Sequence, residues 1–186
     1  GIDFRKENNQ NSDRFFEVRL ASVFRDTPEY KIPQSSTLQG KASNIIGSLE
    51  SKFTENLSFD YNFSLDNDFG TFEHNDLKTE FQTNNFITEF HFHESNGEIG
   101  DSNYLSNETS LFFDDNNSLI FKTRRNRKIS LTEYYDFIYE YQNDCLTAAV
   151  KYRKTYYQDR DITPKEDLFF TITLFPLTTI DQKIDK

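Results

Sequence analysis

The stretch LSFDYNFSL, residues 57–65, alternates strictly between apolar and polar side chains. Successive side chains of a β-strand point to opposite faces of the sheet, so this pattern predicts a strand with one apolar and one polar face. The 3.6-residue repeat of an amphipathic helix does not appear in any long stretch of the chain. The alternation therefore restricts the fold to sheets whose two faces meet different surroundings.

The same period of two recurs along almost the whole chain. It predicts strands at 15–24, 42–53, 57–65, 71–82, 86–93, 105–114, 118–124, 134–142, 145–157 and 167–176, with a remnant of an earlier strand at 1–4. We therefore expect an all-β chain of about ten strands, each roughly ten residues long, which is the length that a tilted strand needs to cross a bilayer. Strands of ordinary soluble proteins are commonly about half as long.

The links between these strands alternate between longer and shorter ones. The longer links are 25–41, 67–70, 96–104, 124–131 and 158–166, and the shorter ones are 54–56, 83–85, 114–117 and 143–144. In an up-and-down meander every second link lies at the same end of the sheet. Long loops at one end and tight turns at the other are typical of an outer-membrane β-barrel, whose long loops lie outside the cell. We therefore expect an antiparallel up-and-down meander that forms an arc of a large transmembrane β-barrel with a wet lumen.

The composition excludes several classes of protein. A formal net charge of −10 argues against a nucleic-acid partner, which would require a basic surface. Aromatic residues make up 16% of the chain, whereas a disordered acidic chain is poor in them. The sequence contains no Met, even at position 1, so we expect a fragment or a processed piece, and the question of a signal peptide stays open.

Cys145 is the only cysteine, so it cannot form a disulfide within the chain. It is either a small buried residue or a half-cystine whose partner lies outside this chain. The sorting of the links places the short link 143–144, and Cys145 directly after it, at the periplasmic end. Because the periplasm is oxidising, the half-cystine is the favoured alternative.

Four pieces stand in a fixed order between residues 132 and 177. They are an aromatic strand before NDC, a small-residue strand after Cys145, the run YRKTYYQDRDITP at 152–164, and the closing LFFTITL. In this order they resemble the C-terminal end of the lipopolysaccharide-assembly outer-membrane proteins of the LptD family, also called organic solvent tolerance proteins. Residues 1–131 match the family only in character, as alternating strands.

The resemblance implies a conduit in the bacterial outer membrane with no chemical step, so we expect neither an enzyme nor a cofactor. A barrel of this family takes lipopolysaccharide from a periplasmic bridge and holds the plug lipoprotein LptE in its lumen. It releases the lipid into the outer leaflet through a lateral gate between its first and last strands. Residues 1–177 would belong to the barrel, surrounded by outer-membrane lipid, and 178–186 would be a periplasmic C-terminal tail.

The resemblance also assigns roles to single positions. Cys145 matches a cysteine that the family links by a disulfide to its periplasmic domain, which we expect to lie outside this sequence. The last strand, 167–176, would be one lip of the gate, with Phe170, Ile172 and Leu174 as its lipid-side candidates.

Two charged segments are expected in the outer loops. In the loop 158–166 we expect Arg160 to pair with Asp159 or Asp161, and Pro164 to end the loop. The other segment is the basic run KTRRNRK at 122–128, which is either a solvated loop or a contact to the phosphates of lipopolysaccharide. Its candidate phosphate-binding residues are Arg124, Arg125 and Arg127.

The remaining motifs carry little chemistry. In EFHFHE (89–94), Glu89, His91 and His93 stand at alternate positions and could hold a metal on one strand face. We expect a polar lumen face without a metal instead. No nucleophile motif stands out, so no catalytic residue is expected.

Two alternatives of other classes stay open. The first is a fragment of a porin-like passive channel without a plug, and the second is a secreted all-β binding module. A partner cysteine bonded to Cys145 would exclude the passive channel, and extraction into detergent would exclude the secreted module.

Overall fold

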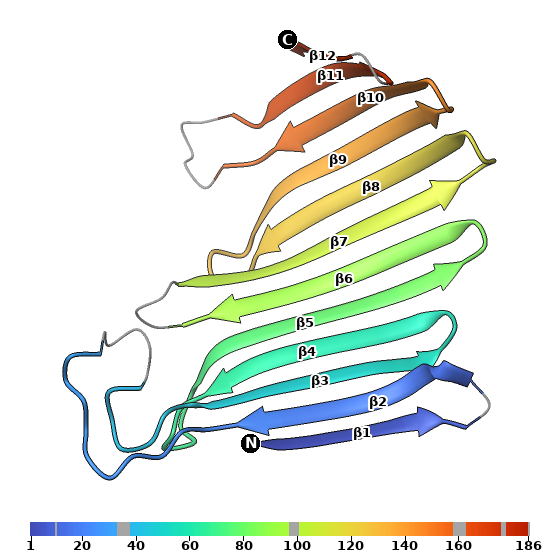
Figure 1. The fold of residues 1–186 in the computed structure, drawn as a ribbon. Helices are drawn as coiled ribbons and strands as arrows, with labels where there is room; N and C mark the ends of the chain where they lie inside the picture. The colour runs from blue at the N-terminus through green and yellow to red at the C-terminus, as the bar shows by residue number, and fades with distance from the viewer. Residues whose placement is uncertain (10, 33–37, 97–100, 158–162, 176–177, 186) are drawn as a thin grey trace. The chain divides into compact units, whose positions relative to one another are not determined.

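In the computed structural model the described residues form β-strands joined by turns and loops, with no helix among them (Figure 1). The structure describes residues 1–9, 11–32, 38–96, 101–157, 163–175 and 178–185, and for residues 11, 12 and 178–185 it describes the backbone alone. The strands are β1 (Ile2–Asn8), β2 (Asn11–Ala21), β3 (Ile45–Thr54), β4 (Leu57–Leu65), β5 (Phe72–Thr83), β6 (Phe86–Ser95), β7 (Ser102–Phe112), β8 (Asn117–Asn126), β9 (Leu131–Gln142), β10 (Leu146–Thr155), β11 (Lys165–Leu174) and β12 (Thr178–Asp185).

The predicted fold class, an all-β antiparallel meander, is confirmed. The strand order is β1 to β12, so each strand lies next to its neighbours in the sequence. The order begins at β1 and ends at β12 without joining them within the described residues, so the sheet is not closed. An open meander of this kind is consistent with an arc of a barrel.

The chain divides into two compact units, which are described separately. Unit 1 comprises residues 1–80 and 91–103, and unit 2 comprises 81–90 and 104–186. In unit 1, β2 pairs with β1 on one side and with β3 on the other, and β3 pairs in turn with β4. In unit 2, the strands from β7 to β12 pair successively in antiparallel register.

The C-terminal segment differs from the expectation of a tail. Thr178–Asp185 form β12, which pairs with β11 through partners such as Leu168↔Ile184 and Ile172↔Ile180. Consequently β11 is not the last strand of the sheet, as the predicted gate lip 167–176 required. The physical reason is that a strand edge left unpaired has backbone donors and acceptors without partners, and the backbone of the segment TTIDQKID supplies them.

The links sort by length much as the sequence predicted. The link 22–44 between β2 and β3 is the longest, and it extends as a paired arm in which Phe24 bridges Ala42 and the Arg25 N–H donates to the Lys41 carbonyl at 2.7 Å (Figure 1). The links 113–116 and 127–130 are of equal length, however, because β8 extends to Asn126. The sorting is therefore clear at most links and absent at this pair.

The described part of the chain contains no buried hydrophobic side chain. Its buried side chains are polar or charged: Glu17, Ser43, Asn44, Ser51, Asn75, Ser118, Asp136 and Asp167. A soluble sheet protein buries its apolar face against a second layer. Here the apolar faces of the strands have no such cover among the described residues.

Candidate functional site: a sheet with one apolar and one polar face

Unit 2 has an exposed apolar face that crosses several strands. Tyr139 of β9 pairs with Val150 of β10, and Val150 pairs with Phe170 of β11, so the three side chains form one cross-strand row. All three side chains are exposed, as are Ile172 and Leu174 further along β11. The residues that the sequence placed on the lipid side of strand 167–176 thus share one exposed face.

The opposite face of unit 2 has a row of alternating charges. The strand register pairs Glu108 with Lys122, Lys122 with Asp136, Asp136 with Arg153, and Arg153 with Asp167. Opposite charges on directly paired strand positions attract each other, whereas like charges repel. Each member of the row, from β7 to β11, therefore lies beside an opposite charge on the neighbouring strand.

Asp136 is the most deeply buried member of this row, at 1% exposure. Its two carboxylate oxygens accept hydrogen bonds from Arg153 Nε at 2.7 Å and Arg153 Nη2 at 2.6 Å. Lys151 Nζ lies 3.2 Å from the same carboxylate, and the Arg153 guanidinium lies 4.9 Å from the centre of the Tyr134 ring. The bidentate pair and the second cation together compensate the buried negative charge.

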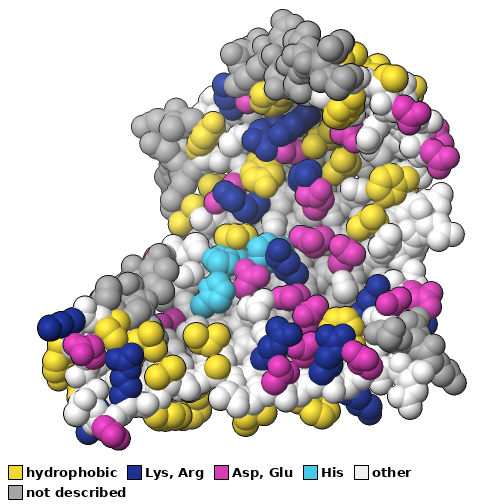
Figure 2. All heavy atoms as spheres, in the orientation of Figure 1, with side chains coloured by type: hydrophobic (Ala, Val, Ile, Leu, Met, Phe, Trp, Pro, Cys, Tyr) yellow, Lys and Arg dark blue, Asp and Glu magenta, His cyan; other side chains and the backbone are white. Residues whose placement is uncertain are grey.

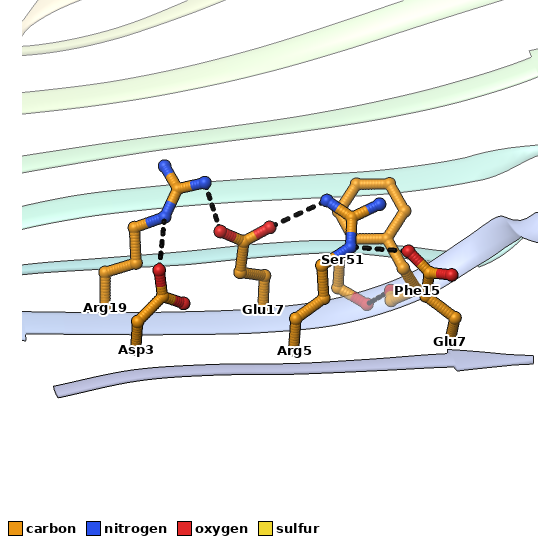
Figure 3. A network of polar contacts seen from close by, with 7 residues as sticks. All are labelled: Asp3, Arg5, Glu7, Phe15, Glu17, Arg19 and Ser51. Atoms are coloured by element: carbon orange, nitrogen blue, oxygen red, sulfur yellow. Dashed lines mark hydrogen bonds and ion pairs between the residues drawn. The ribbon is translucent and has the colours of Figure 1, made fainter.

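Unit 1 has a comparable network on β1 and β2 (Figure 3). Glu17 is buried and accepts from Arg5 Nη1 at 2.9 Å, and it also forms an ion pair with Arg19. Arg5 pairs in addition with Glu7 at 2.7 Å, and its guanidinium lies 4.5 Å from the centre of the Phe15 ring. In this unit too, the buried carboxylate is compensated by two arginines.

The three histidines of the chain converge on one carboxylate in unit 1. Asp76 Oδ2 lies 2.8 Å from His91 Nε2 and 2.8 Å from His93 Nδ1. The rings of His74 and His93 meet edge to face with their centres 5.3 Å apart. In Figure 2 the histidine side chains lie together among the acidic and basic side chains of this face. The sequence singled out His91 and His93 but grouped them with Glu89 rather than with His74 and Asp76.

Cys145 lies in the turn 143–145 between β9 and β10, where it is exposed and has a free thiol. The Asn143 side-chain oxygen accepts from the backbone N–H groups of Cys145 at 3.0 Å and Leu146 at 2.8 Å. The chain therefore contains no disulfide, and a link to a cysteine elsewhere stays a prediction.

The predicted basic loop is partly strand. Arg124 and Arg125 belong to β8, and only Arg127 lies in the following link. The Arg124 guanidinium pairs with Glu133 and lies 5.5 Å from the centre of the Tyr104 ring, so its charge is already compensated. The phosphate contact remains a prediction.

In the other predicted loop, Arg160 and Asp161 lie outside the described residues. Pro164 is described, and it is exposed directly before β11 begins at Lys165.

Sequence reasoning missed most of the polar network. The one signal in the sequence was that Glu17, Asp136 and Arg153 lie on the polar side of their alternating strands, which predicts their face but not their partners. Their partners depend on strand register, which the alternation does not contain.

Comparisons with known proteins add no identification. No protein-family model matches the chain, and no curated protein matches it. Among the described residues, no helix is long and apolar enough to span a membrane.

Proposed function

We propose that this chain forms part of the wall of a bacterial outer-membrane β-barrel that delivers lipopolysaccharide to the outer leaflet through a lateral gate. The observation that carries the membrane assignment is the inverted burial: the buried side chains are polar, and large apolar side chains such as Phe137, Tyr139 and Ile172 are exposed. Lipid hydrocarbon around the apolar face would remove these side chains from water without a second protein layer.

The magnitude of the apolar exposure supports a lipid environment. Removing one large apolar side chain from water is worth about 1.5–3 kcal/mol. The apolar row of unit 2 alone has several such side chains, so a lipid surrounding is favoured over water by many times the thermal energy. Scattered exposed apolar residues are normal on soluble proteins, whereas a contiguous cross-strand row marks an interaction surface.

The polar face fits the wall of a wet lumen. Its two most deeply buried carboxylates, Glu17 and Asp136, are each held by two cations, so their negative charge is compensated within the wall. Such a wall can face water, an amphipathic cargo or a plug such as the lipoprotein LptE. No chemical step is assigned to it.

The choice of lipopolysaccharide as the cargo rests on the resemblance of residues 132–177 to the LptD family. In that proposal, Cys145 is chemically accessible for a disulfide to a periplasmic segment outside this chain. Because β12 covers the edge of β11, the lip of the gate would be the free edge of β12. Phe170, Ile172 and Leu174 would then face lipid beside the gate.

A photo-crosslinking experiment tests the membrane assignment. A benzophenone amino acid at Phe170 or Ile172 should capture lipid in cells, because both side chains lie on the exposed apolar face. The same label at Thr171, which points to the other face of β11, is the matched control and should not capture bulk lipid. Equal capture of bulk lipid, as distinct from lipopolysaccharide, at Thr171 and Phe170 would contradict the proposal, and so would purification from buffer without detergent.

The cargo is tested separately from the membrane assignment. On the polar face, a label at Thr171 should capture lipopolysaccharide while transport is running and lose it when the supply is stopped. A porin-like passive channel gives no such capture, and that result would refute the lipopolysaccharide conduit while leaving the barrel wall standing.

A further inference from the structure

We propose that His74, Asp76 and His93 form a binding site for a divalent transition-metal ion of the zinc class. One ligand atom from each of these residues lies within 4.8 Å of the ligand atoms of the other two. The chain has 3 histidines in 186 residues, and all of them gather around this one carboxylate. This concentration of scarce imidazole groups is the observation that carries the proposal.

The donor set suits zinc-class ions. Two imidazole nitrogens and one carboxylate oxygen are the ligands of many three-residue zinc sites, which keep a fourth position open for water or another ligand. Imidazole also binds copper and nickel, whereas magnesium and calcium prefer oxygen ligands alone. A ligand set of this kind therefore selects a transition metal over the alkaline-earth cations.

The spacing leaves room for an ion after a small adjustment. Nitrogen and oxygen ligands lie about 2.0–2.2 Å from zinc, so the ligand atoms of a tetrahedral site stand roughly 3.3–3.5 Å apart. Here His93 Nδ1 and Asp76 Oδ2 are 2.8 Å apart in a hydrogen bond, and the three ligand atoms spread over no more than 4.8 Å. Rotations of the side chains alone can reach the required spacing.

His91 has a supporting role in this arrangement. Its Nε2 atom lies 2.8 Å from Asp76 Oδ2, so it can donate a hydrogen bond that orients the carboxylate. Supporting hydrogen bonds to ligating carboxylates are a regular feature of metal sites. We therefore assign His91 as a positioning residue and not as a ligand.

The site is held by strands rather than by a loop. His74 and Asp76 stand two residues apart on β5, and His91 and His93 stand two residues apart on β6, so each pair shares one strand face. The side chains of Asp76, His91 and His93 are 19%, 19% and 21% exposed, which leaves an ion an entry path. Sites on strands hold their geometry better than sites on loops. The proposal depends only on this part of unit 1 and not on the proposed transport function.

Metal titration of the purified full chain tests the site directly. Isothermal titration with Zn²⁺ should show one bound ion, and Co²⁺ should give the visible absorption of a low-coordinate nitrogen and oxygen site. His74→Ala, His93→Ala and Asp76→Asn should each weaken Zn²⁺ binding at least about tenfold, a loss that even the removal of a supporting group commonly causes.

Glu94→Gln is the matched control, because Glu94 is a carboxylate on the opposite face of β6 that accepts from Asn103 at 2.8 Å. It should leave Zn²⁺ binding unchanged. The absence of both the Zn²⁺ heat and the Co²⁺ band in the wild type would overturn the proposal, and so would a loss in Glu94→Gln equal to that in Asp76→Asn.

A measurement on the wild-type protein tests the site even if the substituted variants fail to fold. Carbethoxylation by diethylpyrocarbonate, mapped by mass spectrometry, should become slower at His74 and His93 when Zn²⁺ is added. Unchanged rates at both histidines under saturating Zn²⁺ would overturn the site without any substitution.

Discussion

Asp136→Asn tests whether the paired charges of the polar face stabilise unit 2. The substitution keeps the size of the side chain and removes its charge, so Arg153 and Lys151 lose the carboxylate that both contact. Breaking a fully buried ion pair by removing one partner costs about 3–5 kcal/mol. The side chains of Arg153 and Lys151 are 34% and 29% exposed, so water solvates part of the uncompensated charge. We expect a loss of about 2–3 kcal/mol in the free energy of unfolding.

Equilibrium unfolding in urea measures this loss, with the protein in the detergent or buffer that keeps it soluble. Circular dichroism follows strand content and tyrosine fluorescence follows side-chain packing, and coincident curves justify a two-state treatment. Glu108→Gln is the matched control in the same row, because Glu108 and its partner Lys122 are 49% and 35% exposed. A surface pair of this kind contributes at most about 1 kcal/mol.

A double-mutant cycle identifies the partner. If Asp136 acts through Arg153, the variant Asp136→Asn/Arg153→Gln should lose less stability than the sum of the two single variants. The reasoning is refuted if Asp136→Asn costs no more than Glu108→Gln, or if the two single losses simply add.

Three further substitutions or labels probe other parts of the chain. Gly47→Ala should lower the free energy of unfolding by about 1–3 kcal/mol, because the added Cβ would lie 2.3 Å from Phe63 Cζ and must displace the ring; an unchanged urea midpoint would contradict this. The Asn116 backbone N–H and the Asn117 side chain hold the pKa of Asp114 below its ordinary value. The stability that ionised Asp114 contributes is therefore present above about pH 3.9 and is lost as the pH falls through the lower folded-state pKa. Asp114→Ala should abolish this dependence in unfolding curves taken from pH 6 downward. Cys145 should react with a maleimide in the folded protein as fast as after unfolding, since its side chain is exposed, and mass spectrometry would reveal a protected thiol if this is wrong.

The alternation of side chains was sufficient to predict most strands. The stretch 57–65 has the same bounds in the sequence and in β4, because alternation directly reports the two-residue period of the strand backbone. β12 was missed because its eight residues, TTIDQKID, include only two apolar ones, and a short polar segment resembles a tail. The pairing with β11 depends on tertiary contact and not on local preference.

The ion pairs could not be predicted because they depend on the register of the strands. The sequence suggested a two-residue turn at 143–144, which would pair Asp136 with Lys151. In the structure Gln142 pairs with Thr147, so four residues, 143–146, separate the closing pair and Asp136 lies opposite Arg153. The two registers differ by two residues and therefore leave every side chain on the same face, so alternation alone does not choose between the two turns.

The histidine cluster illustrates the same limit. Strand 71–82 has a weak alternation, so the sequence did not show which face His74 and Asp76 occupy. Glu89 was grouped with His91 and His93 because neighbours on one strand are visible in the sequence. The partners on the adjacent strand were not visible, and they are the ones that the structure brings to ligand distance.

The two faces of this sheet must be stabilised in different ways. No apolar side chain is buried among the described residues, so the apolar face gains its favourable environment only from what surrounds the protein. The polar face is stabilised from within, because its charges pair across strands, as Asp136 does with Arg153 and Glu17 does with Arg5. If the apolar face lies in lipid, as proposed, transfer to water would leave those pairs intact while exposing the apolar rows. The chain should then associate through its apolar face before it unfolds, which light scattering on dilution out of detergent would reveal as aggregation with retained strand content.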